Sequence, residues 1–140
     1  MIVELTIDCY TGAYWEEDCI KVIEFDTNST LEFLSYSILE LIKFDHDHLA
    51  IFFAGREASY RSAKIEFCEE DGFELTLDDI FPLPKGLQLF YYYDFGDNWI
   101  FQIKKSRKKP TLPIVGVSYP RVIKEIGPNP DQYGPCDDEY

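Results

Sequence analysis

The chain has 140 residues and a formal net charge of −13; 46% of its residues are hydrophobic and 16% are aromatic. This length favours one domain, and this apolar content argues against general disorder. Residues 1–99 hold 21 of the 26 acidic residues but 6 of the 13 Lys and Arg residues. Such a surface repels nucleic acid and favours cations or basic proteins.

The first half of the chain predicts a β-hairpin followed by a helix. Apolar residues recur over 2–9 and again over 19–25, which indicates two paired strands. Ser29 and Glu32 have the spacing of a capping box. The stripe that follows has helical spacing: Leu31, Leu34, Ile38, Leu41 and Ile42. We therefore expect a helix that begins near Ser29 and carries Lys43 in its last turn, where a cation suits the helix dipole.

The second half predicts two further strand pairs. Residues 49–54 and 60–67 are expected to pair antiparallel, and residues 76–81 to form a short helical turn. Residues 87–93 and 99–105 predict another strand pair. This order describes an α+β fold, in which one principal helix packs on a mainly antiparallel sheet. It is compatible with a β-grasp-like arrangement.

The chain after Lys109 is punctuated by proline and glycine. Continuous helix or sheet is therefore not expected there, although residues 115–123 could pack against the body. We predict a single domain over residues 1–126 and a Pro/Gly-rich acidic tail over 127–140, with a loose acidic end from residue 136 onward.

The cysteines and the N-terminus indicate a cytoplasmic protein. Cys9, Cys19, Cys68 and Cys136 form no C-x-x-C pair and have no His at zinc-finger spacing. The N-terminus lacks the features of a signal peptide, and no apolar stretch is long enough to span a membrane. We expect reduced thiols; a Cys9–Cys19 disulfide across the predicted hairpin is conceivable only in an oxidising compartment.

The string YYYDFGDNW at residues 91–99 is the most distinctive motif. It resembles the Y-x-Y-D-F-G-D-x-W signature of the plasmid pRiA4b open-reading-frame-three-like family, found on plasmids and mobile elements and in chromosomes. Residues 47–49, 77–80 and 119–122 echo further family features in the same order. Phe101 departs from the pattern, because members often carry His there. The resemblance implies a fold and no established reaction or ligand.

Asp94 and Asp97 flank Phe95 and Gly96 in a predicted turn between two strands. A structural interpretation needs no ligand: the Asp side chains bond local N–H groups, Gly96 takes a positive φ, and Phe95 and Trp99 enter the core. The functional interpretation is a recognition surface made of carboxylates and aromatics. Its candidate binding residues are Tyr93, Asp94, Asp97, Trp99 and His48.

Three functions follow from these residues. We expect first a non-enzymatic protein-interaction module with an unidentified protein partner; no catalytic residue and no organic cofactor is predicted. The alternative is a metal-dependent enzyme with a divalent metal, because His46 and His48 would share one side of an extended segment. Its ligands would be Asp94, Asp97, His46 and His48, with Cys136 as a further candidate.

The third interpretation is a nucleic-acid-associated protein of a mobile element, binding through the basic run at residues 104–109. The acidic body and the lack of aromatics within the run argue against it. The run is expected to end a strand as a solvated loop.

Overall fold

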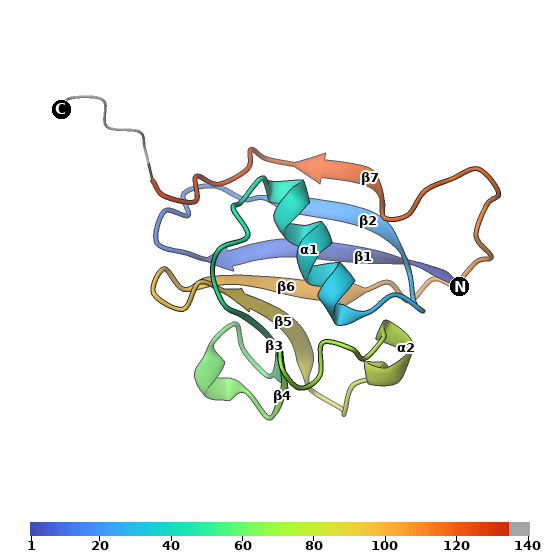
Figure 1. The fold of residues 1–140 in the computed structure, drawn as a ribbon, viewed down its shortest axis with the longest axis horizontal. Helices are drawn as coiled ribbons and strands as arrows, with labels where there is room; N and C mark the ends of the chain where they lie inside the picture. Colours follow the sequence, from blue (N-terminus) through green and yellow to red (C-terminus); the bar gives the residue numbers. More distant parts are fainter. Residues whose placement is uncertain (135–140) are drawn as a thin grey trace.

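A seven-stranded antiparallel sheet forms the body of the protein (Figure 1). The structure is a computed structural model and describes residues 1–134. The strands are β1 (Ile2–Thr11), β2 (Ile20–Asp26), β3 (Ala50–Gly55), β4 (Ile65–Cys68), β5 (Gln88–Tyr93), β6 (Trp99–Lys105) and β7 (Arg121–Ile126). Their order across the sheet is β4-β3-β5-β6-β1-β2-β7, and each neighbouring pair is antiparallel. The α+β class and the antiparallel sheet are thus confirmed, while the β-grasp-like comparison stays a prediction.

The principal helix, α1 (Leu31–Ile42), crosses one face of this sheet (Figure 1). Its N-cap is Thr30, whose hydroxyl accepts a hydrogen bond from the N–H of Phe33. The predicted start at Ser29 was therefore one residue early, and Glu32 forms no capping box. Lys43 is the C-cap, with φ of 60°, so its predicted place in the last turn was also wrong.

A capping box does occur in the short helix α2 (Leu77–Ile80). The Thr76 hydroxyl accepts from the N–H of Asp79, and the Asp79 carboxylate accepts from the N–H of Thr76. A 3-10 turn over Tyr60–Ser62 occupies the first part of the segment predicted as one strand over 60–67. Only its second part, from Ile65, pairs with β3.

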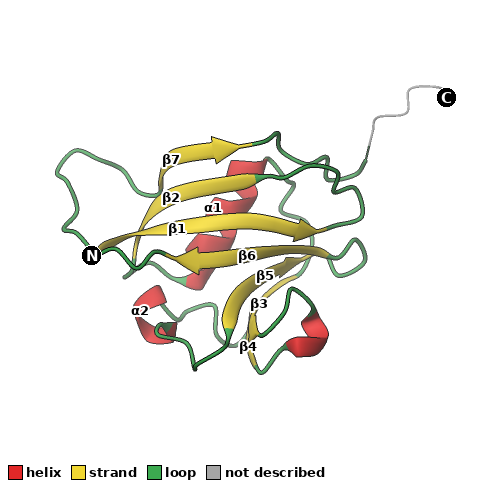
Figure 2. Ribbon diagram, turned by 180° about the vertical axis from the view of Figure 1, so that it is seen from behind, coloured by secondary structure: helices red, strands yellow, loops and turns green. Residues whose placement is uncertain are grey.

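The main core lies between α1 and the sheet. The helix buries Leu31, Leu34, Ile38, Leu39 and Ile42, whereas Leu41 is half-buried. Alternate residues of the strands face this helix, among them Leu5, Phe52, Tyr91 and Trp99. The opposite face, turned toward the viewer in Figure 2, carries a smaller cluster of Phe53, Phe90 and Ile100.

Strand β7 contradicts the prediction that the Pro-rich region forms no sheet. It pairs with β2 at one edge of the sheet, between Pro120 and Pro128 (Figures 1 and 2). Proline prevents ladder bonding at its own position, and the six residues of β7, which lie between these prolines, are free to pair. Glu125 of β7 bonds the ammonium of Lys21, 3.1 Å away, whose side chain is 5% exposed. The Glu125 carboxylate thus offsets the cost of removing the Lys21 ammonium from water.

Within residues 1–134, no helix is long and apolar enough to cross a membrane. The N–H of Cys9, in β1, donates to the carbonyl oxygen of Cys19, which directly precedes β2, and both residues are buried free thiols. Burial, together with the nearby Cys19 and Asp8, raises the pKa of Cys9 to about 12. Cys136 and the predicted loose acidic end lie outside the described residues.

Candidate functional site

The turn at residues 94–98, here called the signature turn, joins β5 to β6. The carbonyl oxygen of Asp94 accepts the N–H groups of Asp97 and Asn98 at 3.0 and 2.7 Å. The left-handed positions are Asp94 and Asn98, with φ of 57° and 58°. Gly96 does not have a positive φ, contrary to the prediction. Asp and Asn are the non-glycine residues that tolerate this region best, because their side chains bond locally.

Trp99 fixes the base of the signature turn. Its ring is fully buried, packs edge-on against Phe44 and lies against Gly12. A Cβ atom added at Gly12 would overlap the ring, so the β1–β2 loop needs glycine there. The N–H of Ala13 also donates to the Asp97 carbonyl oxygen at 2.8 Å. Trp99 is a core residue, as the structural interpretation held, and it supports a surface without being part of it.

The hydroxyl of Tyr93 organises the segment between α1 and β3. It accepts the backbone N–H groups of Asp47 at 3.0 Å and His48 at 3.1 Å, and it donates to the Asp45 carbonyl oxygen. Residues 45–48 are exposed and belong to no helix or strand. One buried side chain therefore holds three backbone groups of a loop. Burial raises the pKa of Tyr93, although the two N–H donors oppose this shift.

His48 joins this loop to the signature turn. Its Nε2 lies 3.4 Å from Oδ2 of Asp94 and 3.3 Å from Oδ1 of Asp47. The hydroxyl of Tyr133 donates to the Asp47 carboxylate at 3.1 Å and lies 3.5 Å from the same His48 nitrogen. Desolvation and the bond to Asp47 raise the pKa of Tyr133 to about 12. The sequence brought His48 and Asp94 together as candidates but did not identify Asp47 or Tyr133 as site residues.

Residues 127–134, assigned from the sequence to the tail, contact the body. The carboxamide of Gln132 is buried and accepts the N–H of Asp45 at 2.5 Å. The carboxamide of Asn129 donates to the Leu41 carbonyl oxygen at 3.3 Å. Both contacts close the C-terminal end of α1. No local sequence pattern predicts these two hydrogen bonds, because the donor and acceptor residues lie more than 80 positions apart in the chain.

The proposed metal ligands are only partly brought together. His48 approaches Asp94, but Nε2 of His46 bonds Glu40 at 2.9 Å, and its ring packs against Tyr36. Asp97 uses its backbone, not its carboxylate, in the contacts of the signature turn. Across residues 1–134, no group of three or more His, Cys, Asp or Glu side chains is arranged to hold a metal ion.

Phe95 lies on the surface rather than in the core. Phe95 is 45% exposed, and its ring packs against that of Tyr92 at an angle of 46°, with 4.7 Å between ring centroids. Leu49 and Tyr60 are likewise exposed, by 65% and 42%. These side chains line a hollow of about 440 Å³ at the β3–β4 edge, which we call the aromatic groove: Leu49, Ala50, Ile51, Tyr60, Cys68, Glu69, Glu70, Tyr92 and Phe95. Sequence reasoning missed it because its residues come from four separate segments.

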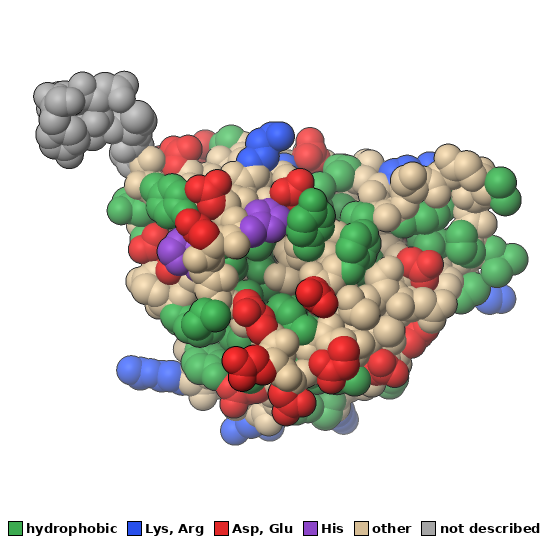
Figure 3. All heavy atoms as spheres, viewed as in Figure 1, with side chains coloured by type: hydrophobic (Ala, Val, Ile, Leu, Met, Phe, Trp, Pro, Cys, Tyr) green, Lys and Arg blue, Asp and Glu red, His purple; other side chains and the backbone are tan. Residues whose placement is uncertain are grey.

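Acidic side chains form part of the border of the aromatic groove. Glu69 and Glu70 form part of its wall, and Glu69 is held in place by the N–H of Ala50 at 2.8 Å. The hydroxyl of Tyr60 donates to Glu66, and this bond, more than burial, raises the pKa of Tyr60 to about 12. Figure 3 shows further Asp and Glu side chains spread over the α1 face, with few cations among them. The groove is therefore apolar inside and negative at its rim.

Comparison with known proteins supports the fold and gives no reaction. The crystal structure of a protein of unknown function, MM3350 from Methanosarcina mazei Go1, is similar with a TM-score of 0.69 and 21% sequence identity. The similarity covers 89% of this chain and 68% of that chain. No curated protein matches the chain. The family model described as plasmid pRiA4b ORF-3-like protein matches residues 13–134, which include the signature turn, and the chain therefore belongs to that family.

Proposed function

We propose that this protein is a protein-interaction module that binds, in its aromatic groove, a partner segment in which an apolar side chain is flanked by Lys or Arg. The observation that carries the proposal is an apolar hollow lined by exposed Phe95, Leu49 and Tyr60 beside Glu69 and Glu70. Exposed apolar patches with a polar rim mark interaction sites. Aromatic residues are enriched in such interfaces and supply much of their energy.

The charge of the rim supports a basic partner. Glu69 and Glu70 lie within the groove, and Glu66 is bonded to Tyr60 at its border. A partner carboxylate there would meet like charges, whereas Lys or Arg would meet complementary ones. The acidic excess of residues 1–99 extends the same field over the body and would raise the association rate of a basic segment.

Phe95 is held in place before a partner binds, so binding does not need to order the turn that carries it. Asp94 and Asn98 close the signature turn, and Trp99 fixes its base in the core. A partner that covers Phe95 therefore gains burial of an aromatic ring that is already positioned. Complete burial of an exposed Phe contributes about 1.5–3 kcal/mol, and Phe95 is 45% exposed, so covering the rest of it contributes about half of that.

Peptide binding tests the proposal. The probes are two labelled libraries in which a central Leu, Phe or Trp is flanked either by Lys and Arg or by Asp and Glu. We expect the basic library alone to contain binders by fluorescence anisotropy. Phe95→Ser should weaken the best binder by at least about tenfold, which corresponds to about 1.4 kcal/mol. The separate variant Glu70→Lys should also weaken binding of this peptide, and the loss should be larger in low salt.

Val115→Ser is the matched control, because Val115 is a fully exposed apolar residue on the loop between β6 and β7. It should bind the peptide as the wild type does. The proposal fails if neither library yields a binder, if the acidic library binds as well, or if binding survives Phe95→Ser.

A further inference from the structure

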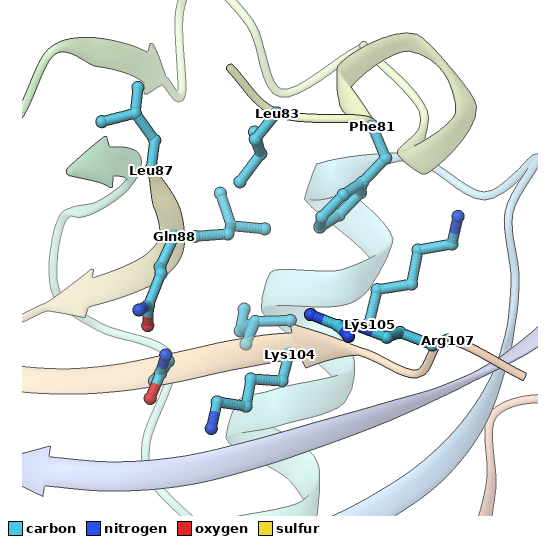
Figure 4. A pocket seen from close by; sticks show the side chains of 10 residues that line it. Phe81, Leu83, Leu87, Gln88, Lys104, Lys105 and Arg107 are labelled. Atoms are coloured by element: carbon cyan, nitrogen blue, oxygen red, sulfur yellow. The ribbon is translucent and has the colours of Figure 1, made fainter. Parts of the chain in front are cut away.

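The loop between β6 and β7 contains a basic and apolar stretch that the body leaves uncovered. The basic run ends β6, as predicted, and Arg107 lies just beyond the end of that strand (Figure 4). Every residue from 107 to 116 is exposed. Leu112 and Ile114 are exposed by 74% and 56%. A group of exposed apolar side chains, unlike a single one, marks an interaction site.

This stretch has the sequence pattern of a proline-rich ligand. Residues 107–114, here called the basic proline segment, have the sequence RKKPTLPI. Pro110 and Pro113 form the one P-x-x-P pattern of the chain. Segments with this pattern take an extended polyproline II conformation and dock into grooves lined by aromatic side chains. Binding orders little of their backbone, because proline restricts it beforehand.

The body holds the middle of the basic proline segment and leaves its side chains exposed. The N–H of Thr111 donates to the carbonyl oxygen of Ile2 at 3.0 Å, and the N–H of Ile2 donates to the carbonyl oxygen of Thr111 at 2.7 Å. Pro110 and Leu112, on either side of Thr111, are exposed. The segment is therefore positioned before any partner covers it, which lowers the entropy lost on binding.

We propose that the aromatic groove of one copy of this protein binds the basic proline segment of a second copy. This inference rests on the proposed function and names the partner. Tyr60, Tyr92 and Phe95 line the groove, as aromatic side chains line the grooves that recognise P-x-x-P segments. The apolar anchor is Leu112, which lies between the two prolines and is already exposed.

Charge favours the same pairing. Arg107 and Lys109 of the segment, like Glu69 and Glu70 of the groove, take part in none of the ion pairs formed within residues 1–134. Two cations of one copy thus meet two carboxylates of the next, which opposes the repulsion between two acidic chains. The segment also belongs to the part of the chain, residues 100–140, in which 7 Lys and Arg residues outnumber 5 Asp and Glu residues.

The groove and the segment lie at opposite ends of the molecule, so the contact forms between copies. Phe95 precedes β6 in the signature turn, and the segment follows that strand (Figures 1 and 2). The 7 residues of β6 span about 20 Å. The bonds between Thr111 and Ile2 hold the segment at the far end. A contact between two different surfaces of one chain builds rings or open chains, or a two-fold dimer when it is exchanged.

Sedimentation velocity of the full chain tests the proposal. The mean mass should rise with protein concentration between about 1 μM and 1 mM. Phe95→Ser in the groove and Leu112→Ser in the segment should each weaken self-association by at least about tenfold. An equimolar mixture of these two variants should form a 1:1 complex and nothing larger, because one intact groove meets one intact segment. Val115→Ser, in the turn just after the segment, should associate as the wild type does.

A peptide of residues 106–114 separates this inference from the proposed function. It should bind the wild type in fluorescence anisotropy, and Leu112→Ser in the peptide or Phe95→Ser in the protein should weaken it by at least about tenfold. If the basic library yields binders but this peptide does not bind, or the full chain stays monomeric at every concentration, the inference is overturned and the proposed function stands. If neither library nor peptide binds, both fail. A monomeric chain that binds phosphatidylserine vesicles through Leu112 would overturn the inference in favour of a lipid surface.

Discussion

Three consecutive tyrosines of β5 differ sharply in what their hydroxyls contact, and Tyr93→Phe is predicted to be the costly change. Its hydroxyl makes three hydrogen bonds to the loop at residues 45–48. Each such bond contributes about 0.5–1.5 kcal/mol net, and water can reach part of this loop. We therefore expect the free energy of unfolding to fall by about 2 kcal/mol.

The neighbouring tyrosines are the matched controls. Tyr92→Phe removes a weak, exposed 3.4 Å contact to the Phe95 carbonyl oxygen and should change stability by less than about 0.5 kcal/mol. Tyr91→Phe removes one buried 2.6 Å bond to Ser35 and should cost about 1 kcal/mol.

Urea unfolding followed by circular dichroism gives these free energies, and a thermal scan gives the matching melting shift. For 140 residues the unfolding entropy is about 0.3 kcal/mol/K, so Tyr93→Phe should lower the melting temperature by about 7 °C. If Tyr93→Phe is no more destabilising than Tyr92→Phe, the hydroxyl does not hold the loop and the reasoning is wrong.

Three further changes test the supports of the fold. Gly12→Ala should destabilise by about 1–3 kcal/mol in urea unfolding, because the added methyl group overlaps the ring of Trp99. Glu125→Ala should cost about 1–3 kcal/mol, since it leaves the buried ammonium of Lys21 without its partner. Stability should fall as pH rises from about 9 toward 12, because the unfolded chain ionises Cys9 first while the folded state, with its raised pKa, keeps the thiol protonated. Melting temperatures measured across this range should fall less steeply for a Cys9→Ala variant.

Each of these three stability predictions has a control variant or a result that would contradict it. Gly96→Ala should be tolerated, because the nearest atom to a Cβ there is 3.6 Å away; equal losses at both glycines would refute the packing argument. Glu70→Ala removes a carboxylate that has no ion-pair partner among residues 1–134, and it should leave stability nearly unchanged. Identical pH profiles for wild type and Cys9→Ala would show that another group controls the alkaline transition.

Local pattern was sufficient for most of the fold. The strand pairs around residues 2–25 and 87–105 were predicted because alternating apolar residues, turn residues and short connections all lie close together in sequence. The start of α1 was displaced because Ser29 and Thr30 are both good N-cap residues, and the choice of Thr30 depends on tertiary contacts such as its bridge to Thr76.

The features that the sequence did not predict depend on contacts between residues that are far apart in the chain. Strand β7 is exposed along its whole length, so it has no apolar alternation to distinguish it from a Pro-rich loop. Phe95 was expected in the core because the residue type is apolar, but Asp94 in a left-handed conformation redirects the turn. Tyr133 and Gln132 reach the loop at residues 45–48 only through the path of the chain after β7.

A backbone amide NMR titration with the best basic–apolar peptide tests most directly whether the aromatic groove is the binding surface. We expect saturable shifts of the amide signals of Leu49, Glu70, Tyr92 and Phe95. Phe95→Ser should abolish them, while the rest of its spectrum stays that of the folded protein. Saturable shifts confined to another surface, or an unchanged titration in Phe95→Ser, would contradict it.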